Sequence, residues 1–385
     1  MPIFLPLYIK SIKFVPTFEM RSRFEHRHDR DFDKSVNDYK TDSLLRIRFG
    51  FTANLAEGLD SEMRYQYSQL TPSGPKLGQV SEDGDIDLLN LKFKTPSATW
   101  TAGRQKVALS STRLVGTGDW NNIGRSWDAI RASGRDWDLF AGAVGVSANR
   151  PDKARFAAGT MRWKHGETLL AFKSDEVSGK DSRIYTLDHN YTKKFGQVAL
   201  TLEGALQGGR SQGKDQEAWA LHSRLSRTAG NFTPYIEASF ASGGGDSSKS
   251  RTFDPLYGST HGFHGIADLQ GWKNEDYVSV GVDFRAGSQL SGRASYHRMR
   301  LRDASDAWYG TSGANKFGGT VFVDPTGASG KDVGQEYDLD LTWSVDKKTD
   351  IRFGVAVFDP GSFVRNLSGK GDNMTFGYLQ FIVKF

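Results

Sequence analysis

Residues 373–385, at the end of the chain, read NMTFGYLQFIVKF and decide the fold. Counted back from the last residue, alternate positions include Val383, Phe381 and Leu379, while the other face carries the polar Gln380. This two-residue period predicts a β-strand with one apolar and one mixed face. A chain that stops on an aromatic residue suits the closing strand of an outer-membrane barrel, which places a ring at the membrane interface. The last strand of a soluble β-sandwich is the alternative.

The bulk composition is compatible with one large barrel. The chain has 385 residues, of which 43 are glycine and 12% are aromatic, and this suits many turns and two aromatic girdles. It has no cysteine, which excludes disulfides, thiol catalysis and Cys-ligated metals. The mean hydropathy is -0.51, and no apolar run approaches the roughly 20 residues of a membrane helix. Hydropathy does not detect strands that are apolar only at every second residue.

The charge is mildly basic, with 50 Lys and Arg residues against 45 Asp and Glu residues. A nucleic-acid-binding protein would gather this excess in one patch, whereas here the basic residues recur at alternate positions along predicted strands. This spacing predicts the lining of a lumen and no nucleic-acid partner. Residues 1–10 lack the basic start and the small-residue cleavage site of a signal peptide, so export is inferred from the rest of the chain.

The predicted first strand, residues 14–27, carries more charges on its polar face than the last strand does. Phe14, Phe18 and Phe24 share its apolar face. The opposite face carries Glu19, Arg21, Arg23, Glu25 and Arg27. So many charges on one face cannot pack into a dry core, but they can line water. Similar strands are predicted at residues 45–55, 59–67, 89–94, 98–104, 126–133, 137–146, 155–163, 168–174, 183–191, 197–207, 217–226, 232–241, 278–285, 289–299, 336–345 and 351–357.

Short and long connections alternate between these strands. Alternation places all the short turns at one end of the array, as in a transmembrane barrel. We therefore predict an all-β fold: a single transmembrane antiparallel β-barrel of about 18 strands, with short periplasmic turns and long extracellular loops. It forms one domain over residues 1–385, with an N-terminal extension at 1–12 and strands from about residue 13. The largest long connections are residues 69–85, 105–125, 242–274, 301–333 and 359–372.

A barrel of about 18 strands encloses more space than its inward side chains fill, so we expect a water-filled lumen unless loops narrow it. Inward arginines would attract anions, and the planar guanidinium suits carboxylates because it forms paired hydrogen bonds. The alternative is that these charges pair with inward acids, such as Glu203, Glu336 and Asp338, and stiffen the wall. The inward basic candidates are Arg21, Arg23, Arg46, Arg48, Lys92, Lys94, Arg131, Arg293 and Arg352.

Two long segments, residues 103–131 and 253–269, are rich in Trp, Tyr, Phe, His and Asn. Long loops of this composition often fold into a pore, so we expect both segments inside the barrel.

Motifs in these segments and in several strands resemble, in order and spacing, the alginate export porin family of Gram-negative outer membranes. The resemblance covers nearly the whole chain. It implies an 18-stranded barrel with an electropositive, arginine-lined constriction that passes the acidic polysaccharide alginate. Within the motifs, Arg104, Arg125 and Asp128 are further pore-lining candidates. The motifs lie at residues 19–25, 103–105, 113–116, 120–122, 124–131, 257–258, 261, 268–269, 334–339 and 358–361.

The sequence therefore predicts a non-enzymatic channel in the bacterial outer membrane that passes anionic solutes, such as alginate or related uronate polymers and oligomers, by passive diffusion. A general or engineered porin without polymer specificity is the first alternative. The second is a barrel-embedded hydrolase, because His261 and His264 lie near Asp254 and Ser259 in one long loop.

The expected partners are membrane lipid, lipopolysaccharide, and acidic polysaccharide or small anions, and the expected state is a monomer. No cofactor is expected. Residues 83–87 carry alternating acids like part of a calcium loop but lack the glycine and distal glutamate of an EF-hand. A weakly bound loop Ca²⁺ and a solvated acidic turn are the two interpretations.

Overall fold

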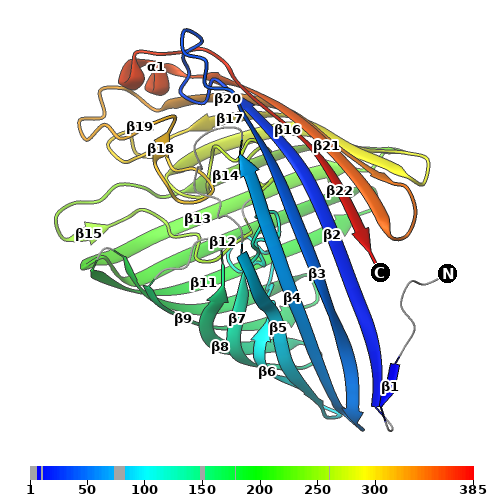
Figure 1. The fold of residues 1–385 in the computed structure, drawn as a ribbon. Coiled ribbons are helices and arrows are strands. Elements are labelled where there is room, and N and C mark those ends of the chain that lie inside the picture. The colour runs from blue at the N-terminus through cyan, green and yellow to red at the C-terminus, as the bar shows by residue number, and fades with distance from the viewer. Residues whose placement is uncertain (1–6, 10–11, 73–82, 148–151, 178, 260) are drawn as a thin grey trace.

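The computed structural model of the chain describes residues 7–9, 12–72, 83–147, 152–177, 179–259 and 261–385. Their strands form a closed antiparallel barrel of 18 strands (Figure 1), which confirms the predicted fold class. The barrel strands are β2 (Ile12–His28), β3 (Lys40–Ala56), β4 (Leu59–Pro72), β5 (Asp83–Lys94), β6 (Thr99–Gln105), β7 (Ser126–Ser133), β8 (Trp137–Val146), β9 (Asp152–Trp163), β10 (Gly166–Val177), β11 (Lys180–Phe195), β12 (Val198–Ser211), β13 (Lys214–Arg227), β14 (Phe232–Ala241), β16 (Glu275–Ala286), β17 (Leu290–Arg300), β20 (Asp332–Ser344), β21 (Thr349–Pro360) and β22 (Met374–Lys384).

The last strand closes the barrel against the first. β22 pairs antiparallel with β2, with Arg23 opposite Gln380. The pairing continues to the terminal residue, because the Phe385 amide donates to the Phe18 carbonyl at 2.9 Å and the Phe18 amide donates to the Phe385 carbonyl at 3.1 Å. Closure thus pairs the two edge strands of the sheet with each other from Phe18 to His28, as a membrane requires.

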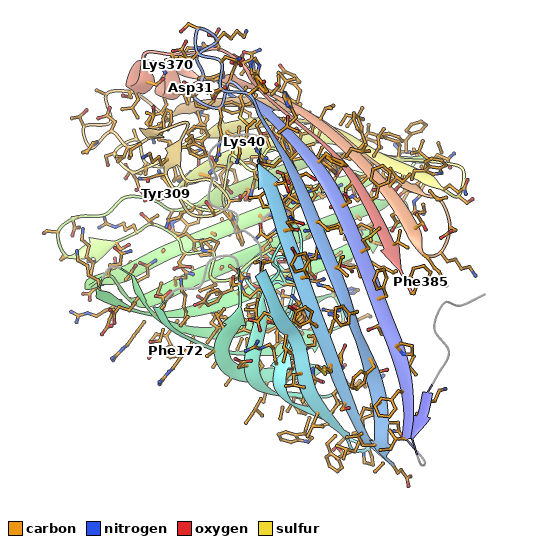
Figure 2. All side chains as sticks on the ribbon, viewed as in Figure 1. Asp31, Lys40, Phe172, Tyr309, Lys370 and Phe385 are labelled. Carbon is orange, nitrogen blue, oxygen red and sulfur yellow. The ribbon has the colours of Figure 1, made fainter. Side chains whose placement is uncertain are left out.

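The two faces of the wall differ as the alternation predicts. On β2, Phe24 is 47% exposed on the outer face, while its neighbours Arg23 and Glu25 are buried in the interior. On β22, Leu379 and Phe381 are exposed outside, whereas Gln380 is buried inside. The side chains that surround the wall in Figure 2 include many such apolar outer residues. The outer face therefore suits lipid, and the inner face is polar.

The long connections gather at one end of the barrel, together with the minor elements other than β1, which lies at the opposite end (Figure 1). The turn at residues 212–213 shows that short links also occur at this end. Lys370 lies 3.3 Å from Asp31, so the segment after α1 contacts the loop between β2 and β3 (Figure 2). The minor elements are β1 (Leu7–Ile9), which pairs with the start of β2, and β15 (Lys249–Ser250), β18 (Lys316–Phe317), β19 (Thr320–Val321) and α1 (Ser362–Ser368).

In the predicted connection at residues 69–85, residues 73–82 lie outside the described residues. None of the helices in the described part of the chain is long and apolar enough to cross a membrane.

Two apolar clusters occupy parts of the interior. One contains Trp127 and Phe156 of the wall together with Tyr257 of the connection at 242–274. The other gathers Trp308 and Phe322 of the connection at 301–331 with other buried rings. Loops thus fill space that the wall side chains leave open, as expected of a barrel this wide.

A charge on the lipid face should destabilise this barrel. Val280, in the middle of β16, is exposed on the outer face. We expect Val280→Arg to lower the free energy of unfolding by about 2–4 kcal/mol, because the guanidinium would lie in hydrocarbon. Urea titration of folding into liposomes, followed by tryptophan fluorescence, measures this. The control Val280→Leu should differ from the unchanged protein by less than about 1.5 kcal/mol. Equal midpoints for the two variants would contradict the assigned face.

Candidate functional site

Four predicted arginines form one group on the inner wall. Arg21 and Arg23 come from β2, Arg46 and Arg48 come from β3, and Arg21 lies directly opposite Arg46 in the strand register. All four are almost completely buried. We call these four residues the arginine cluster. Adjacent buried cations repel one another, so their stability depends on nearby acceptors.

The connection between β6 and β7, residues 106–125, supplies these acceptors. Arg21 donates to the Asp119 carbonyl at 2.6 Å, and Arg46 donates to the same oxygen at 3.0 Å. Arg23 donates to the Trp120 carbonyl at 2.8 Å. The wall thus binds the backbone of an inward-folded loop, which agrees with the predicted position of this segment inside the barrel.

The Asp119 side chain lies among basic groups but remains accessible to water. Its Oδ1 is 2.8 Å from Arg48 Nη2, 3.6 Å from Lys106 Nζ and 3.8 Å from Arg46 Nη1. Burial alone would raise the pKa of Asp119, but Lys106, Arg48 and Arg46 together hold that pKa well below its usual range. The side chain is nevertheless 41% exposed. The cluster therefore binds a carboxylate at a point that water reaches.

Three further acids neutralise part of the charge of the cluster and of Lys106. Glu19 accepts from Arg46 at 2.8 Å and from Arg48 at 3.3 Å. Asp87 on β5 lies 2.9 Å from Lys106. Glu25 lies 2.7 Å from Arg23. The arginine cluster and Lys106 supply five cations against these three carboxylates and Asp119, so one positive charge is in excess among these groups.

A stack of three side chains joins the wall to both inward loops. The Arg23 guanidinium lies 3.8 Å from the centre of the Trp120 ring. On Trp120 stacks the imidazole of His261, with ring centres 3.4 Å apart and planes 2° from parallel. Nδ1 of His261 is 3.0 Å from the Asp268 carboxylate. The cation–π contact and the ring stacking therefore hold one loop against the other, while Asp268 contacts the imidazole from within its own loop.

The two loops also pair through their backbones. The Tyr257 amide donates to the Leu114 carbonyl at 3.0 Å, and the Gly116 amide donates to the Tyr257 carbonyl at 3.0 Å. A Cβ on Gly116 would lie 2.1 Å from Ser259 Oγ, and one on Gly258 would lie 1.9 Å from the Arg113 carbonyl oxygen. Only glycine permits this approach, which explains the motif glycines at 116 and 258.

The predicted inward acids Glu336 and Asp338 hold the second loop, residues 242–274, against strand β20 of the wall. The Ile266 amide donates to Asp338 at 2.9 Å, and the Ala267 amide donates to Glu336 at 3.0 Å. His264 Nε2 lies 3.0 Å from Glu275. These carboxylates therefore position a loop in addition to setting the charge of the lumen.

The sequence-based candidates did not include four side chains that complete the interior. Asp119 contacts the arginine cluster directly, and Lys106 lies beside it, next to Asp119 and Asp87. Arg113 lies 3.1 Å from Glu237 and 3.5 Å from Glu203, and Lys173 lies 2.7 Å from Asp254. Their signal in the sequence was weak, because Lys106, Asp119 and Arg113 occur in a loop without strand alternation.

The remaining inward candidates lie on wall strands beside carboxylates, as in the predicted alternative. They are partly exposed, so the lumen near the short turns is lined by paired charges next to water. The pairs are Arg131–Asp138 at 2.8 Å, Arg293–Asp283 at 2.6 Å, Arg352–Asp340 at 3.2 Å, Lys92–Glu62 at 2.8 Å and Lys94–Asp60 at 2.6 Å.

The three candidates taken from the motifs lie in different places. Arg125 is inside, where it donates to the Gly116 carbonyl at 3.1 Å and to the Tyr257 carbonyl, and burial lowers its pKa to about 10. Arg104 and Asp128 pair at 2.7 Å on the outer face, in register with the exposed Leu89. Their placement differs from the pore-lining position that we expected.

The loop histidines do not assemble a hydrolytic site in the described part of the chain. Nε2 of His261 has no hydrogen-bond partner there. Nε2 of His264 is 3.3 Å from Ser239 Oγ, but that serine is fully buried and donates to Glu275 at 2.8 Å. His261 stacks on Trp120 and His264 contacts Glu275, so both imidazoles help to hold the loop in place.

The acids expected in a calcium loop belong to strand β5. Asp85 lies 3.2 Å from Arg104, and Asp87 lies 2.6 Å from Arg64. These partners are cations, so the geometry is that of ion pairs.

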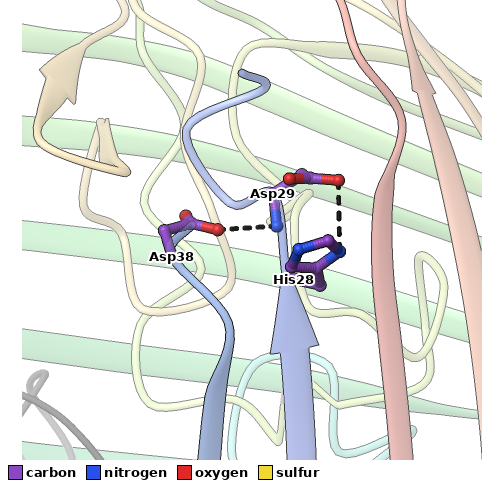
Figure 3. A group of neighbouring side chains, drawn as sticks. All are labelled: His28, Asp29 and Asp38. Atoms are coloured by element: carbon purple, nitrogen blue, oxygen red, sulfur yellow. Dashed lines mark hydrogen bonds and ion pairs between the residues drawn. The ribbon is translucent and has the colours of Figure 1, made fainter. Parts of the chain in front are cut away.

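A different group, His28, Asp29 and Asp38, gathers at the end of β2 (Figure 3). Asp38 already accepts the backbone amides of Asp29 and Arg30, at 2.8 and 3.0 Å. These two hydrogen bonds close a turn at the end of β2.

The sequence matches the family model described as "Alginate export" over residues 17–377. The chain belongs to the alginate export family. None of the curated proteins matches it. Its fold is similar to many solved structures, and three proteins of Pseudomonas aeruginosa are examples. OccK5 (OpdH) has a TM-score of 0.66 at 12% identity, with 97% of this chain and 98% of that chain covered. OpdQ has 0.66 at 13%, with 98% and 99% covered, and OpdK with vanillate has 0.64 at 15%, with 96% and 98% covered.

Family membership and fold together place this alginate export family member in the bacterial outer membrane as a porin. The long connections then lie at the extracellular end, and the short turns face the periplasm.

The depressed pKa of Asp119 leads to a prediction about pH. A carboxylate whose folded pKa lies below its unfolded value of about 3.9 stabilises the fold above that pH and loses this effect only as pH falls further. Asp119→Asn should lower the free energy of unfolding by about 1 kcal/mol, because water screens this exposed group. The difference should be constant from pH 8 to pH 5, as measured by urea titration. Asp119→Glu, which keeps the charge, is the control, and a difference that fades near pH 6 would contradict the assignment.

Proposed function

We propose that this porin is a passive channel for acidic sugars, namely uronate monomers and short oligomers related to alginate. The observation that carries the proposal is the Asp119 carboxylate, bound by Arg48, Arg46 and Lys106 at a point that water reaches. A group of cations that binds the protein's own carboxylate has the chemistry to bind the carboxylate of a solute.

The carboxylate of a solute can take the place of the Asp119 carboxylate beside these cations. This exchange gives a route through the part of the lumen where the arginine cluster lies. A uronate that arrives beside Asp119 meets guanidinium and ammonium donors already oriented for a carboxylate. The excess of cations raises the local concentration of anions. Because the occupied state already contains one carboxylate, the solute is bound weakly enough to leave. Net transport then follows the concentration gradient.

The inward loops favour monomers and short oligomers over long polymers. Residues 106–125 and 242–274 bind each other and the wall strands β2 and β20, so they narrow the lumen where the arginine cluster lies. The family description, alginate export, supports a uronate as the solute. The structural neighbour OpdK was determined with vanillate, which is also a carboxylate.

Single-channel recording in a planar bilayer tests this function. Under a KCl gradient, the reversal potential should show anion selectivity, and tri-uronate should interrupt the current. Arg48→Gln, which removes the direct partner of Asp119, should reduce anion selectivity and weaken the block by roughly tenfold, the effect of one lost charge-assisted hydrogen bond.

Two comparisons make the result specific. A neutral trisaccharide should not block the unchanged channel. Arg104→Gln removes an arginine of the outer face and should leave selectivity and block unchanged. Cation selectivity, or no block by any uronate, would reject the proposal and favour a general porin without solute specificity.

A further inference from the structure

A shallow groove of about 900 Å³ lies on the lipid-facing surface of the barrel, across strands β6 to β12. Its floor consists of small residues, Ala141 on β8 and Ala157 and Gly159 on β9. Large apolar side chains rise on both sides, among them Trp100, Ile130, Leu139, Leu170, Phe172, Tyr185, Leu187 and Leu206. A groove with apolar walls on a lipid-facing surface suits the hydrocarbon chains of a lipid.

The groove arises because this part of the wall carries its large residues inside. Trp127, Phe140 and Phe156 are buried within the barrel and pack on one another, and Trp127 and Phe156 also pack against Tyr257 of the inward loop. On the outer face of β8 and β9 the register pairs Ala141 directly with Ala157. The same packing that holds the loop therefore leaves the outer surface hollow.

A row of arginines borders the groove at its extracellular edge. Arg155, Arg183 and Arg210 are exposed on the outer face. Each lies two residues along its strand from a groove residue: Ala157 on β9, Tyr185 on β11 and Gly208 on β12. Two residues of a strand span roughly 7 Å, so the guanidinium groups can reach the head of a molecule whose tails fill the groove.

The strand register places these arginines side by side. Arg155 lies opposite Ser174 on β10, Ser174 lies opposite Arg183, and Arg183 lies opposite Arg210. Neighbouring strands are about 4.8 Å apart, so the row from Arg155 to Arg210 is roughly 14 Å wide. Two or more anionic groups on one molecule can therefore contact the row together.

The arginines of this row are largely available for a ligand. Arg155 and Arg183 have no ion-pair or hydrogen-bond partner within the described part of the chain. Arg210 has only a long contact, 3.5 Å, to the exposed Asp215. Arg104, on the same outer face, is instead paired with Asp128 and Asp85.

Acids also lie near the row, two of them on the neighbouring strand β13, where Asp215 lies opposite Arg210 and Glu217 lies opposite Gly208. Asp181 and Glu176 lie opposite each other, two residues further toward the loops than Arg183 and Ser174. Glu217 is paired with Lys249 at 2.6 Å. From β9 to β12 the charged residues at this edge are thus basic, with Asp181 and Glu176 on the water side and the acids of β13 at the end of the row.

We propose that this groove and its arginine row bind a phosphorylated, multiply acylated glycolipid of the outer leaflet, the lipid A part of lipopolysaccharide. The row lies at the extracellular end, where the outer leaflet meets the barrel. The acyl chains fill the groove, and the phosphates accept charge-assisted hydrogen bonds from the three arginines, whose fork geometry suits phosphate oxygens. The site lies outside the lumen and does not depend on the proposed solute.

Native mass spectrometry of the full-length barrel in detergent tests the site, with diphosphoryl lipid A as the probe. We expect the unchanged protein to bind one lipid A more tightly than phosphatidylglycerol. The combined variant Arg155→Gln, Arg183→Gln and Arg210→Gln should bind lipid A at least about tenfold more weakly, because several charge-assisted hydrogen bonds are lost. Ala157→Phe, which fills the groove and leaves the arginines in place, should also weaken binding.

Matched variants separate the site from general attraction of anions. Arg227→Gln with Arg285→Gln changes exposed arginines at the periplasmic end and should leave lipid A binding unchanged. Single-channel conductance should be the same in all variants, so a failure of the solute proposal would not affect this result. The proposal is overturned if the triple variant binds lipid A as tightly as the unchanged protein, or if phosphatidylglycerol binds as tightly and loses affinity equally.

Discussion

Closure of the strand ladder between β2 and β22 is the constraint on which the rest of this structure depends. Hydrocarbon offers no hydrogen bonds, so each backbone N–H and C=O of the wall must find a partner in another strand. Once the ladder is closed, adjacent residues of every strand face opposite environments. Arg23 and Phe24 are neighbours in the sequence, but one is buried in the interior and the other faces lipid.

A closed wall then leaves an interior with many charges that need partners. On β2 and β3 the arginine cluster would be unstable as a group of buried cations. Backbone carbonyls at Asp119 and Trp120 accept its hydrogen bonds, so the position of the loop and the stability of the wall depend on the same contacts. The carboxylate of Asp119 is thereby held beside the cations and within reach of water. The proposed preference for uronates follows from this contact.

Much of the fold could be predicted because strand alternation is local information. Strand alternation also predicts the correct position of Arg104. Trp100 and Arg104 share the outer face of β6, while Thr101 and Gln105 share its buried face. The family motif predicts a lumen position for Arg104, whereas the alternation of β6 predicts the outer face that the structure shows. For residues 106–125 no such period exists, so Lys106 and Asp119 could not be assigned from the sequence.

By itself, the sequence determined the strands, the closing role of residues 373–385 and the face of most wall residues, because a period of two acts over a few neighbouring positions. Only the tertiary structure decided which partner each inward charge takes. Arg21 and Asp119 are 98 positions apart, and no local pattern relates them. The tertiary structure also decided the groove on the lipid-facing surface. The groove depends on the sizes of residues on several adjacent strands and on the ring of Tyr257, which packs behind them from the inward loop.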